Sequence, residues 1–358
     1  MLSFVNQLKK NNFGRSLLSV ILAVAVFCSA LSMVALIPTF AEYEVWDGSQ
    51  TAPTQGTGTE TDPIIINEAS ELYYVIKNGG GADTYYKLNK DIYLNDLTKV
   101  NWLTGSVANG YKVKSWTSGV DAVFQGHIDG NNHTVYGLYV HDNKVNYSTY
   151  HSYGAGLIPH ALTGTTTIKN LAIDYSFMRY ESGCGLFVGA VGSPDATGTK
   201  VSLTNCYAGA NVGLDGGSVS GLVGVLYDSS VNLLNCYSLA SVIHSENTGL
   251  VGHDNQYNSD IVINNCFNAN GPLSICAPSY YCTADNCYAT EESVSADGRF
   301  PLTNGVTVIT AENMQGIDVF TNSAKMPNLN ADGAFLAGDD FPTLAVFSKT
   351  DDDDNDNT

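Results

Sequence analysis

A repeated unit of about thirty residues constrains the fold of this chain more than any other feature. In each copy an alternating segment ends in asparagine, which cysteine and then an aromatic residue follow. The copies are Asn205-Cys206-Tyr207, Asn235-Cys236-Tyr237 and Asn265-Cys266-Phe267, with a period of 30 residues, and a fourth, Asn286-Cys287-Tyr288, comes 21 residues later. A unit this short cannot bury its own apolar face, so successive copies are expected to stack on one another.

Gly-Leu pairs mark the same repeats. They fall at Gly156-Leu157, Gly185-Leu186, Gly221-Leu222 and Gly249-Leu250, and the last two continue as Gly-Leu-Val-Gly, through Gly224 and Gly252. Short strands between glycine turns predict an all-β fold, a parallel and right-handed β-helix or solenoid. Equivalent residues would then form ladders about 4.8 Å apart. We expect stacked asparagines at corners, buried thiols inside and aromatic residues stacked between coils.

The chain divides into four predicted parts. Residues 1–41 have a basic start, an apolar run and a small-x-small end, which predicts a signal peptide, or an anchor if uncleaved. Residues 42–62 form a polar leader, 63–348 a single β-solenoid domain and 349–358 an acidic, disordered tail.

Several local elements can also be placed. Asn67 is expected to cap a short helix that ends before Gly79, and residues 310–316 form a second short capped helix. The segment 124–138 predicts two short strands around an Asp-Gly-Asn turn, and 341–347 predicts a last strand.

Charge excludes some classes of partner. The 358 residues contain 35 acidic and 16 basic side chains, a formal net charge of −19. A phosphate backbone or an anionic lipid surface would be repelled by such a chain. We therefore expect no nucleic-acid partner, and membrane contact only through an uncleaved N-terminal segment.

The Gly-Leu-Val-Gly segments at Gly221–Gly224 and Gly249–Gly252 resemble the GLUG-motif modules of bacterial surface proteins. Such modules occur in large adhesins and in the non-catalytic regions of IgA-specific metallopeptidases. The resemblance covers roughly residues 44–348. It implies an exported bacterial protein that acts as a stalk or an adhesive surface, without catalytic residues. The His-Glu-x-x-His motif of those metallopeptidases is absent from this chain.

An enzyme on the same fold is the alternative, because polysaccharide lyases and hydrolases also use parallel β-helices. Hydrolysis needs paired carboxylates, and the candidates are Asp129, Asp174 and Glu181. Lyases of acidic sugars need cationic side chains. After residue 41, however, the chain contains only two arginines, Arg179 and Arg299. Asp129 lies in an Asp-Gly-Asn sequence, for which turn formation is the simpler explanation.

The sequence contains only weak patterns for a metal site or a disulfide. Cys276, Cys282 and Cys287 lack zinc-site spacing, and a disulfide among them is the more plausible role. Residues 328–339 faintly resemble a calcium loop, with asparagine in place of aspartate at its first and third positions. We expect no cofactor and keep Ca²⁺ as a weak alternative.

Tyrosines supply the candidate ligand-binding residues, which are Tyr147, Tyr150, Tyr153, Tyr280 and Tyr281. Exposed aromatic side chains could bind a glycan or an extracellular protein, although single packing roles explain them as well. The sequence thus favours a non-enzymatic surface protein, an adhesin or structural stalk module. A carbohydrate-active enzyme and a unit that assembles by stacking are the alternatives.

Overall fold

The computed structural model describes residues 43–116, 123–142, 154–180, 184–193, 198–216, 219–243, 249–252, 259–270, 282–290 and 305–348. The predicted signal peptide and acidic tail lie outside these residues. Residues from Val45 onward form one compact unit. The described part is mostly β-strand, and its sheets are parallel except for two short antiparallel pairs. The predicted parallel, all-β character is therefore confirmed.

The alternating segments form one series of strands in a 14-stranded sheet. These strands are β9 (Thr165–Asp174), β13 (Thr199–Thr204), β18 (Ser229–Leu234), β21 (Asp260–Asn264) and β23 (Cys282–Asp285). They pair in register, so that Ile168, Leu203, Leu233 and Ile263 are successive partners. All four side chains are buried, as the alternation of apolar and polar residues predicts.

A second series of five strands belongs to the same sheet, and all but the last come just after an asparagine of the repeats. They are β14 (Tyr207–Ala208), β19 (Tyr237–Ser238), β22 (Phe267–Asn268), β24 (Cys287–Ala289) and β25 (Val306–Val308). Each pairs in parallel with the strand of the neighbouring repeat. The asparagine is thus a corner between two segments of one sheet.

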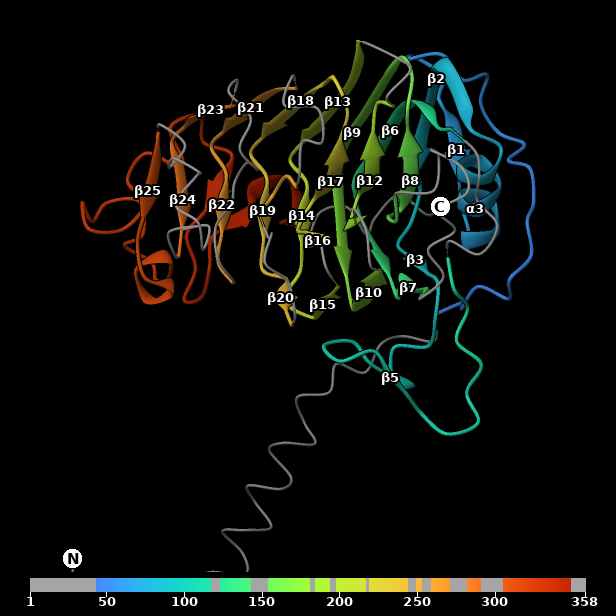
Figure 1. The fold of residues 1–358 in the computed structure, drawn as a ribbon, viewed down its shortest axis with the longest axis horizontal. Helices are drawn as coiled ribbons and strands as arrows, with labels where there is room; N and C mark the ends of the chain where they lie inside the picture. The colour runs from blue at the N-terminus through green and yellow to red at the C-terminus, as the bar shows by residue number, and fades with distance from the viewer. Residues whose placement is uncertain are drawn as a thin grey trace, which may run out of the picture. The chain divides into compact units, whose positions relative to one another are not determined.

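Each repeat contributes further strands to smaller parallel sheets, which Figure 1 shows side by side along the chain. One consists of β7 (Tyr139–Asp142), β10 (Ser176–Tyr180), β15 (Val212–Asp215) and β20 (Ser241–Val242). Another consists of β8 (Ile158–Ala161), β12 (Val188–Val191) and β17 (Val223–Leu226). A third pairs β11 (Cys184–Gly185) with β16 (Val219–Ser220).

A helix packs at the N-terminal end of the main sheet. The strands there are β1 (Ile64–Ile66), β2 (Gly80–Leu88) and β3 (Ile92–Tyr93), and the helix is α3 (Ala69–Lys77). Its apolar face is buried as predicted, but its N-cap is Glu68 and not Asn67. The Asn67 side chain instead accepts a hydrogen bond from Asn89, while its backbone N–H donates to Glu71 at 2.6 Å. The Glu71 carboxylate in the first turn therefore bonds back to the residue before the N-cap, and the predicted side-chain cap is absent.

The expected pair of strands around residues 129–131 is a single strand, β6 (Gln125–Tyr136). Both of its halves pair in parallel with β9, with a shift of register between Asp129 and His133. Asn131 and Asn132 have φ of 50° and 65° there. The prediction of a hairpin-like turn was wrong, because the chain turns a corner and continues in the same direction.

Two large apolar clusters contain most of the buried apolar residues in the described part of the chain. The larger contains the inward residues of the repeats, and the smaller lies under the C-terminal segment. That segment comprises η1 (Ala311–Met314), β26 (Phe335–Leu336), β27 (Thr343–Leu344) and η2 (Ala345–Phe347). Thr310 caps η1 as predicted, through its side chain. The predicted last strand is wrong in extent, since β27 is two residues long, pairs antiparallel with β26 and passes into a 3₁₀ turn.

An excursion from the repeats carries the antiparallel pair β4 (Val100–Asn101) and β5 (Ser106–Val107).

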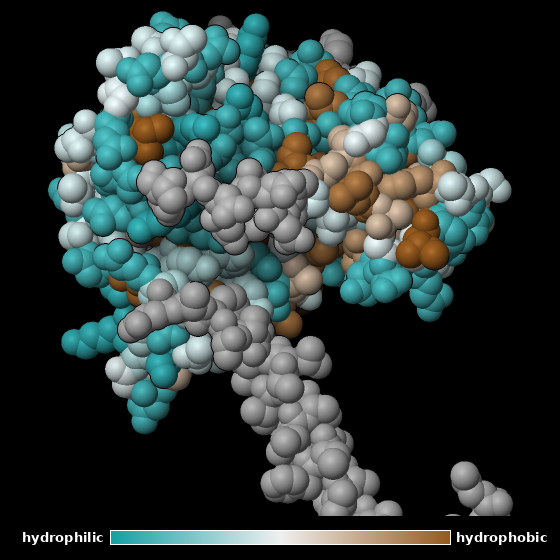
Figure 2. All heavy atoms as spheres, turned by 180° about the vertical axis from the view of Figure 1, so that it is seen from behind, coloured by the Kyte–Doolittle hydropathy of each residue, from teal (hydrophilic) through white to brown (hydrophobic). Residues whose placement is uncertain are grey.

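Figure 2 shows a largely hydrophilic rear face, with apolar side chains gathered toward the end that carries the C-terminal elements. Among the large apolar side chains, Val308, Ile317, Leu336 and Val346 of the C-terminal part are exposed. Among the described residues, the helices are all too short or too polar to cross a membrane.

Candidate functional site

A continuous chain of side-chain hydrogen bonds follows the corner positions. Asn205 donates to Asn170 at 2.9 Å, Asn235 to Asn205 at 3.1 Å, Asn265 to Asn235 at 3.2 Å and Asn286 to Asn265 at 3.1 Å. In each bond the Nδ2 amide donates toward the N-terminal neighbour. The structure thus brings together the four predicted asparagines and adds Asn170, which the sequence placed at the end of a strand without the cysteine that follows the others.

All five asparagines have a left-handed backbone, with φ between 52° and 53°. Asparagine tolerates this conformation better than most residues, and its short amide can both donate and accept. The same side chain therefore makes the corner and bonds it to the neighbouring corners. We refer to Asn170, Asn205, Asn235, Asn265 and Asn286 as the asparagine ladder.

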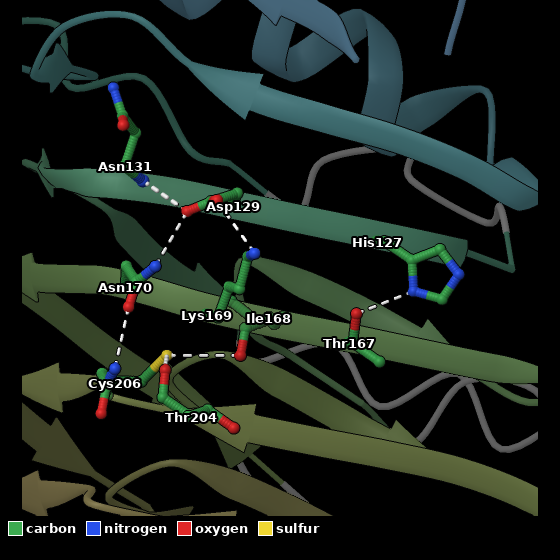
Figure 3. A network of polar contacts seen from close by, with 10 residues as sticks. His127, Asp129, Asn131, Thr167, Ile168, Lys169, Asn170, Thr204 and Cys206 are labelled. Carbon is green, nitrogen blue, oxygen red and sulfur yellow. Dashed lines mark hydrogen bonds and ion pairs between the residues drawn. The ribbon is translucent and has the colours of Figure 1, made fainter. Parts of the chain in front are cut away.

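Asp129 ends this ladder at its acceptor side (Figure 3). Its Oδ1 accepts from Asn170 Nδ2 at 3.1 Å and from the backbone N–H of Asn131 at 2.9 Å. Its Oδ2 lies 3.2 Å from Lys169 Nζ. A carboxylate accepts but does not donate, so it suits the end of a chain in which every amide donates in one direction. Both oxygens are engaged in structural contacts, which fits the turn explanation given above.

A second polar row lies beside Asp129 on the same strands. His127 Nδ1 is 2.8 Å from the Thr167 hydroxyl, and the His127 ring stacks on Tyr85 with centroids 4.2 Å apart. The register aligns these three residues across β2, β6 and β9. The row is half-buried, and it gives this outer face an aromatic and hydroxyl-bearing character.

Asp174 is a partly buried carboxyl group at the next corner. It accepts from the backbone N–H groups of Tyr175 and Asn211 at 2.8 and 3.0 Å, and from the Asn211 side chain at 3.4 Å. Burial raises the pKa of Asp174 above its usual value, and these hydrogen bonds offset part of the effect.

The structure does not pair the predicted acidic candidates with one another. Asp129 is aligned with Lys169, whereas Asp174 is aligned with Tyr136, beyond the Asn170 corner. Arg179 forms its ion pair with Asp215, at 3.3 Å, which the sequence did not single out. Glu181 lies outside the described residues.

The cysteines of the repeats form a column inside the sheet corner. Cys206, Cys236, Cys266 and Cys287 are free and completely buried. Their thiols contact backbone carbonyls two residues earlier, and the Cys236 backbone N–H lies 3.3 Å from the sulfur of Cys266. Burial raises the pKa of the Cys206 and Cys266 thiols.

The aromatic residues stack as well, but on the outer side of the sheet. Tyr207 and Tyr237 have centroids 4.8 Å apart, and Tyr237 and Phe267 4.7 Å apart, with nearly parallel rings. Phe335 and Phe347 of the C-terminal segment pack against this stack. The aromatics therefore join repeat to repeat, as expected, and also anchor a segment that the sequence treated separately. Tyr288 takes part through its hydroxyl, which accepts from Asn328 N at 3.1 Å.

The glycines of the Gly-Leu segments face other backbones directly. A Cβ atom on Gly185 would overlap the backbone of Gly224, and one on Gly224 would overlap Gly189 and Cys184. A Cβ on Gly156 would overlap Gly185. Two backbone layers therefore approach more closely than any side chain allows, which explains the glycines. The sequence contained the signal as a recurring Gly-Leu pair but gave no reason for it.

The remaining candidate residues from the sequence either lie outside the described part of the chain or do not form a site. Tyr147, Tyr150, Tyr153, Tyr280, Tyr281 and Cys276 lie outside the described residues. Cys282 is disulfide-bonded and Cys287 is free, so Cys287 is not part of a bridge. In the segment that faintly resembles a calcium loop, Asn330 and Asp332 accept from backbone N–H groups as in turns. No group of three His, Cys, Asp or Glu side chains suited to a metal occurs within the described ranges.

Comparison with known proteins shows only distant similarity in sequence and in structure. No family model matches the chain. Halomucin from Haloquadratum walsbyi is 27% identical over 186 residues, which is 52% of this chain and 2% of that protein. The chain thus spans a small fraction of this relative's length. A crystal structure from Bacteroides ovatus, of a protein assigned as an immunoglobulin A1 protease, has a TM-score of 0.46 and 18% identity, covering 81% of this chain and 94% of that one.

Proposed function

We propose that this chain is an exported, non-enzymatic β-solenoid of the GLUG type. In this proposal it acts at the cell surface as an adhesin or as a stalk that presents its faces to a glycan or an extracellular protein. The recurring corners, in-register strands and backbone-packed glycines support the solenoid. The stretch of similarity to a protein named as a mucin agrees with an extracellular setting.

The observation that carries the non-enzymatic part is the engagement of the acidic candidates. Asp129 receives an amide, a backbone N–H and an ammonium group, and Asp174 is held by three donors around Asn211 and Tyr175. Glycoside hydrolysis needs two carboxyl groups that face each other across a substrate. The register instead aligns these two with different residues on either side of a corner.

The experiment is binding of the purified full-length protein to an array of glycans and extracellular-matrix proteins, with and without Ca²⁺. We expect retention on one ligand class, with no change in the mass of that ligand over time. The urea-unfolded protein is the control, because a binding surface built by the fold should be lost with it.

New reducing ends or unsaturated sugars in the bound ligand would contradict this proposal and favour a polysaccharide hydrolase or lyase. In that case D129N and D174N would separate the two acidic candidates. Loss of turnover in either variant, with binding retained, would assign the catalytic carboxyl group.

A further inference from the structure

We propose that the outer face of the sheet β7–β10–β15–β20 holds a subsite for a sugar that carries a carboxylate, with Arg179 as its anchor. The inference deepens the proposed function, because it rests on the idea that the chain binds a ligand without cleaving it. It depends on four features of one face, which are the register, the ion pair, the neighbouring excursion and the local charge.

The register places two outward rows on this sheet. Tyr139, Phe177 and Gly213 are aligned in the first row, and His141, Arg179 and Asp215 in the second. Side chains aligned on one face of parallel strands stand about 4.8 Å apart. Ile243 follows β20 at the end of the second row, where its backbone N–H donates to Leu214 at 2.9 Å.

The excursion that carries β4 and β5 covers only the first row. The Tyr139 hydroxyl donates to the Gly105 carbonyl at 3.1 Å, and Gly105 lies against the Phe177 ring with no room for a side chain. Gly213 lies directly beneath the backbone of Trp102 and Leu103. In the second row, His141 and Arg179 remain exposed beside the excursion, whereas Asp215 is buried.

Arg179 is held in place but not covered. Its Nε is 3.3 Å from Asp215 Oδ2, and its side chain is 50% exposed while that of Asp215 is 10% exposed. The two terminal nitrogens of the guanidinium make no hydrogen bond to the described residues. A fixed guanidinium with two free nitrogens is suited to a bidentate contact with a carboxylate.

The surroundings favour a sugar over a simple anion. His141 is exposed next to Arg179 on the neighbouring strand, where it can face a bound sugar. Leu103 and Ile243, which are 42% and 37% exposed, give apolar edges for the C–H face of a pyranose ring. The net charge of −19 would repel a polyanion, so a single terminal carboxylate at short range fits better than a charged polymer.

The test compares methyl β-glucuronide with methyl β-glucoside, which differ in one carboxylate, by NMR titration of the full-length protein. We expect the glucuronide to bind and the glucoside to bind at least about tenfold more weakly, since a charge-assisted bidentate contact is lost. R179M should weaken glucuronide binding by about tenfold, and R179K should recover only part of it. K200M, which removes one exposed positive charge from β13, is the matched control and should bind as the wild type does.

A second variant guards against a folding defect in R179M. I243D places a repelling carboxylate at the end of the row and should also weaken the glucuronide without changing the thermal midpoint. Equal binding of the two glycosides, or glucuronide binding that R179M and I243D leave unchanged, would overturn the inference. So would an aspartate-containing peptide that competes as well as the glucuronide.

The two proposals can fail separately. Array binding that R179M does not affect would remove this subsite and leave the surface-binding function in place. Arg179-dependent binding followed by cleavage of a glucuronide-containing oligosaccharide would keep the subsite and refute the non-enzymatic function.

Discussion

Asparagine suits the corner positions because it combines a tolerated left-handed backbone with an amide that bonds in two directions. Asn235 illustrates both properties, with φ of 53°, a bond to Asn205 and a bond from Asn265. Leucine or serine could satisfy neither requirement fully. The combination of backbone conformation and amide bonding therefore explains why the repeats use asparagine and not simply any polar residue.

Replacing Asn235 should separate these two properties. N235A loses two side-chain hydrogen bonds and forces a Cβ residue without a local bond into the left-handed region, so we expect a loss of about 3 kcal/mol in the free energy of unfolding. N235G loses the same bonds but tolerates the backbone, and should cost about 1–2 kcal/mol less. Urea denaturation would measure both, and equal losses would show that backbone conformation contributes little.

The close backbone packing at the glycines of the Gly-Leu segments gives a second prediction at the residue scale. G224A would drive a methyl group into the backbone of Gly189, so we expect a loss of about 1–3 kcal/mol or more. G338A is the matched control, since no heavy atom lies within 4 Å of the added Cβ. Thermal unfolding of the two variants should differ clearly, and a neutral G224A would refute the close backbone packing.

Asp174 should make stability depend on pH. Its pKa is raised in the folded protein, so its contribution is complete below its ordinary value of 3.8 and is lost as pH rises through the folded value. The thermal midpoint of the wild type relative to D174N should therefore fall as the pH rises above about 4. D332N removes a carboxylate from an exposed turn and is the control for the loss of one negative charge. A difference that grows with pH would contradict the assigned direction.

At the scale of elements, the C-terminal segment is joined to the repeats by aromatic packing. Met314, Phe335 and Leu344 are fully buried against the stack that contains Tyr237 and Phe267. These elements are short, and their own hydrogen bonds are few. Their position depends mainly on buried apolar area contributed by the repeats.

F335A should release this segment. The side chain is 1% exposed, and deleting a buried phenylalanine typically costs about 3–5 kcal/mol. We expect faster hydrogen exchange and proteolysis within residues 310–348, with the repeats still protected. L336A changes the adjacent, exposed residue of the same strand and should leave exchange unchanged. Uniform loss of protection in F335A would mean that the segment and the repeats unfold together.

The whole molecule keeps five thiols away from solvent. Cys184, Cys206, Cys236, Cys266 and Cys287 are free and buried, and burial raises the pKa of the Cys184 thiol. A thiol that alkylating reagents cannot reach reacts slowly with them. Reactivity at these positions therefore reports on separation of the repeats.

Site-resolved alkylation tests this expectation. In the native protein we expect no labelling of the five cysteines by iodoacetamide over a period in which the urea-unfolded protein is labelled completely. Peptide mass spectrometry distinguishes them from Cys28 and Cys276. Native labelling of Cys236, at the middle of the column, would show that the packed repeats open more readily than their hydrogen bonds suggest.

The sequence determined the features that repeat. Period and alternation were enough to predict parallel strands, asparagine corners and buried residues such as Leu203 and Leu233, because stacking converts equal spacing along the chain into contact in space. Asp129 does accept the backbone N–H of Asn131, as its Asp-Gly-Asn sequence suggests, but it does so within a continuous strand and not in the predicted turn. The helix cap and the extent of the last strand were misjudged, since their hydrogen bonds depend on neighbours that local patterns do not specify.

Only the tertiary structure decided how different repeats and excursions meet. The pairing of Arg179 with Asp215, the cover that residues near Gly105 give to Phe177, and the docking of Phe335 on the aromatic stack join positions between 36 and about 100 residues apart. No periodicity connects such positions. The physical reason is that ladders follow from one repeated spacing, whereas a surface site depends on which side chains the non-repeating segments leave uncovered.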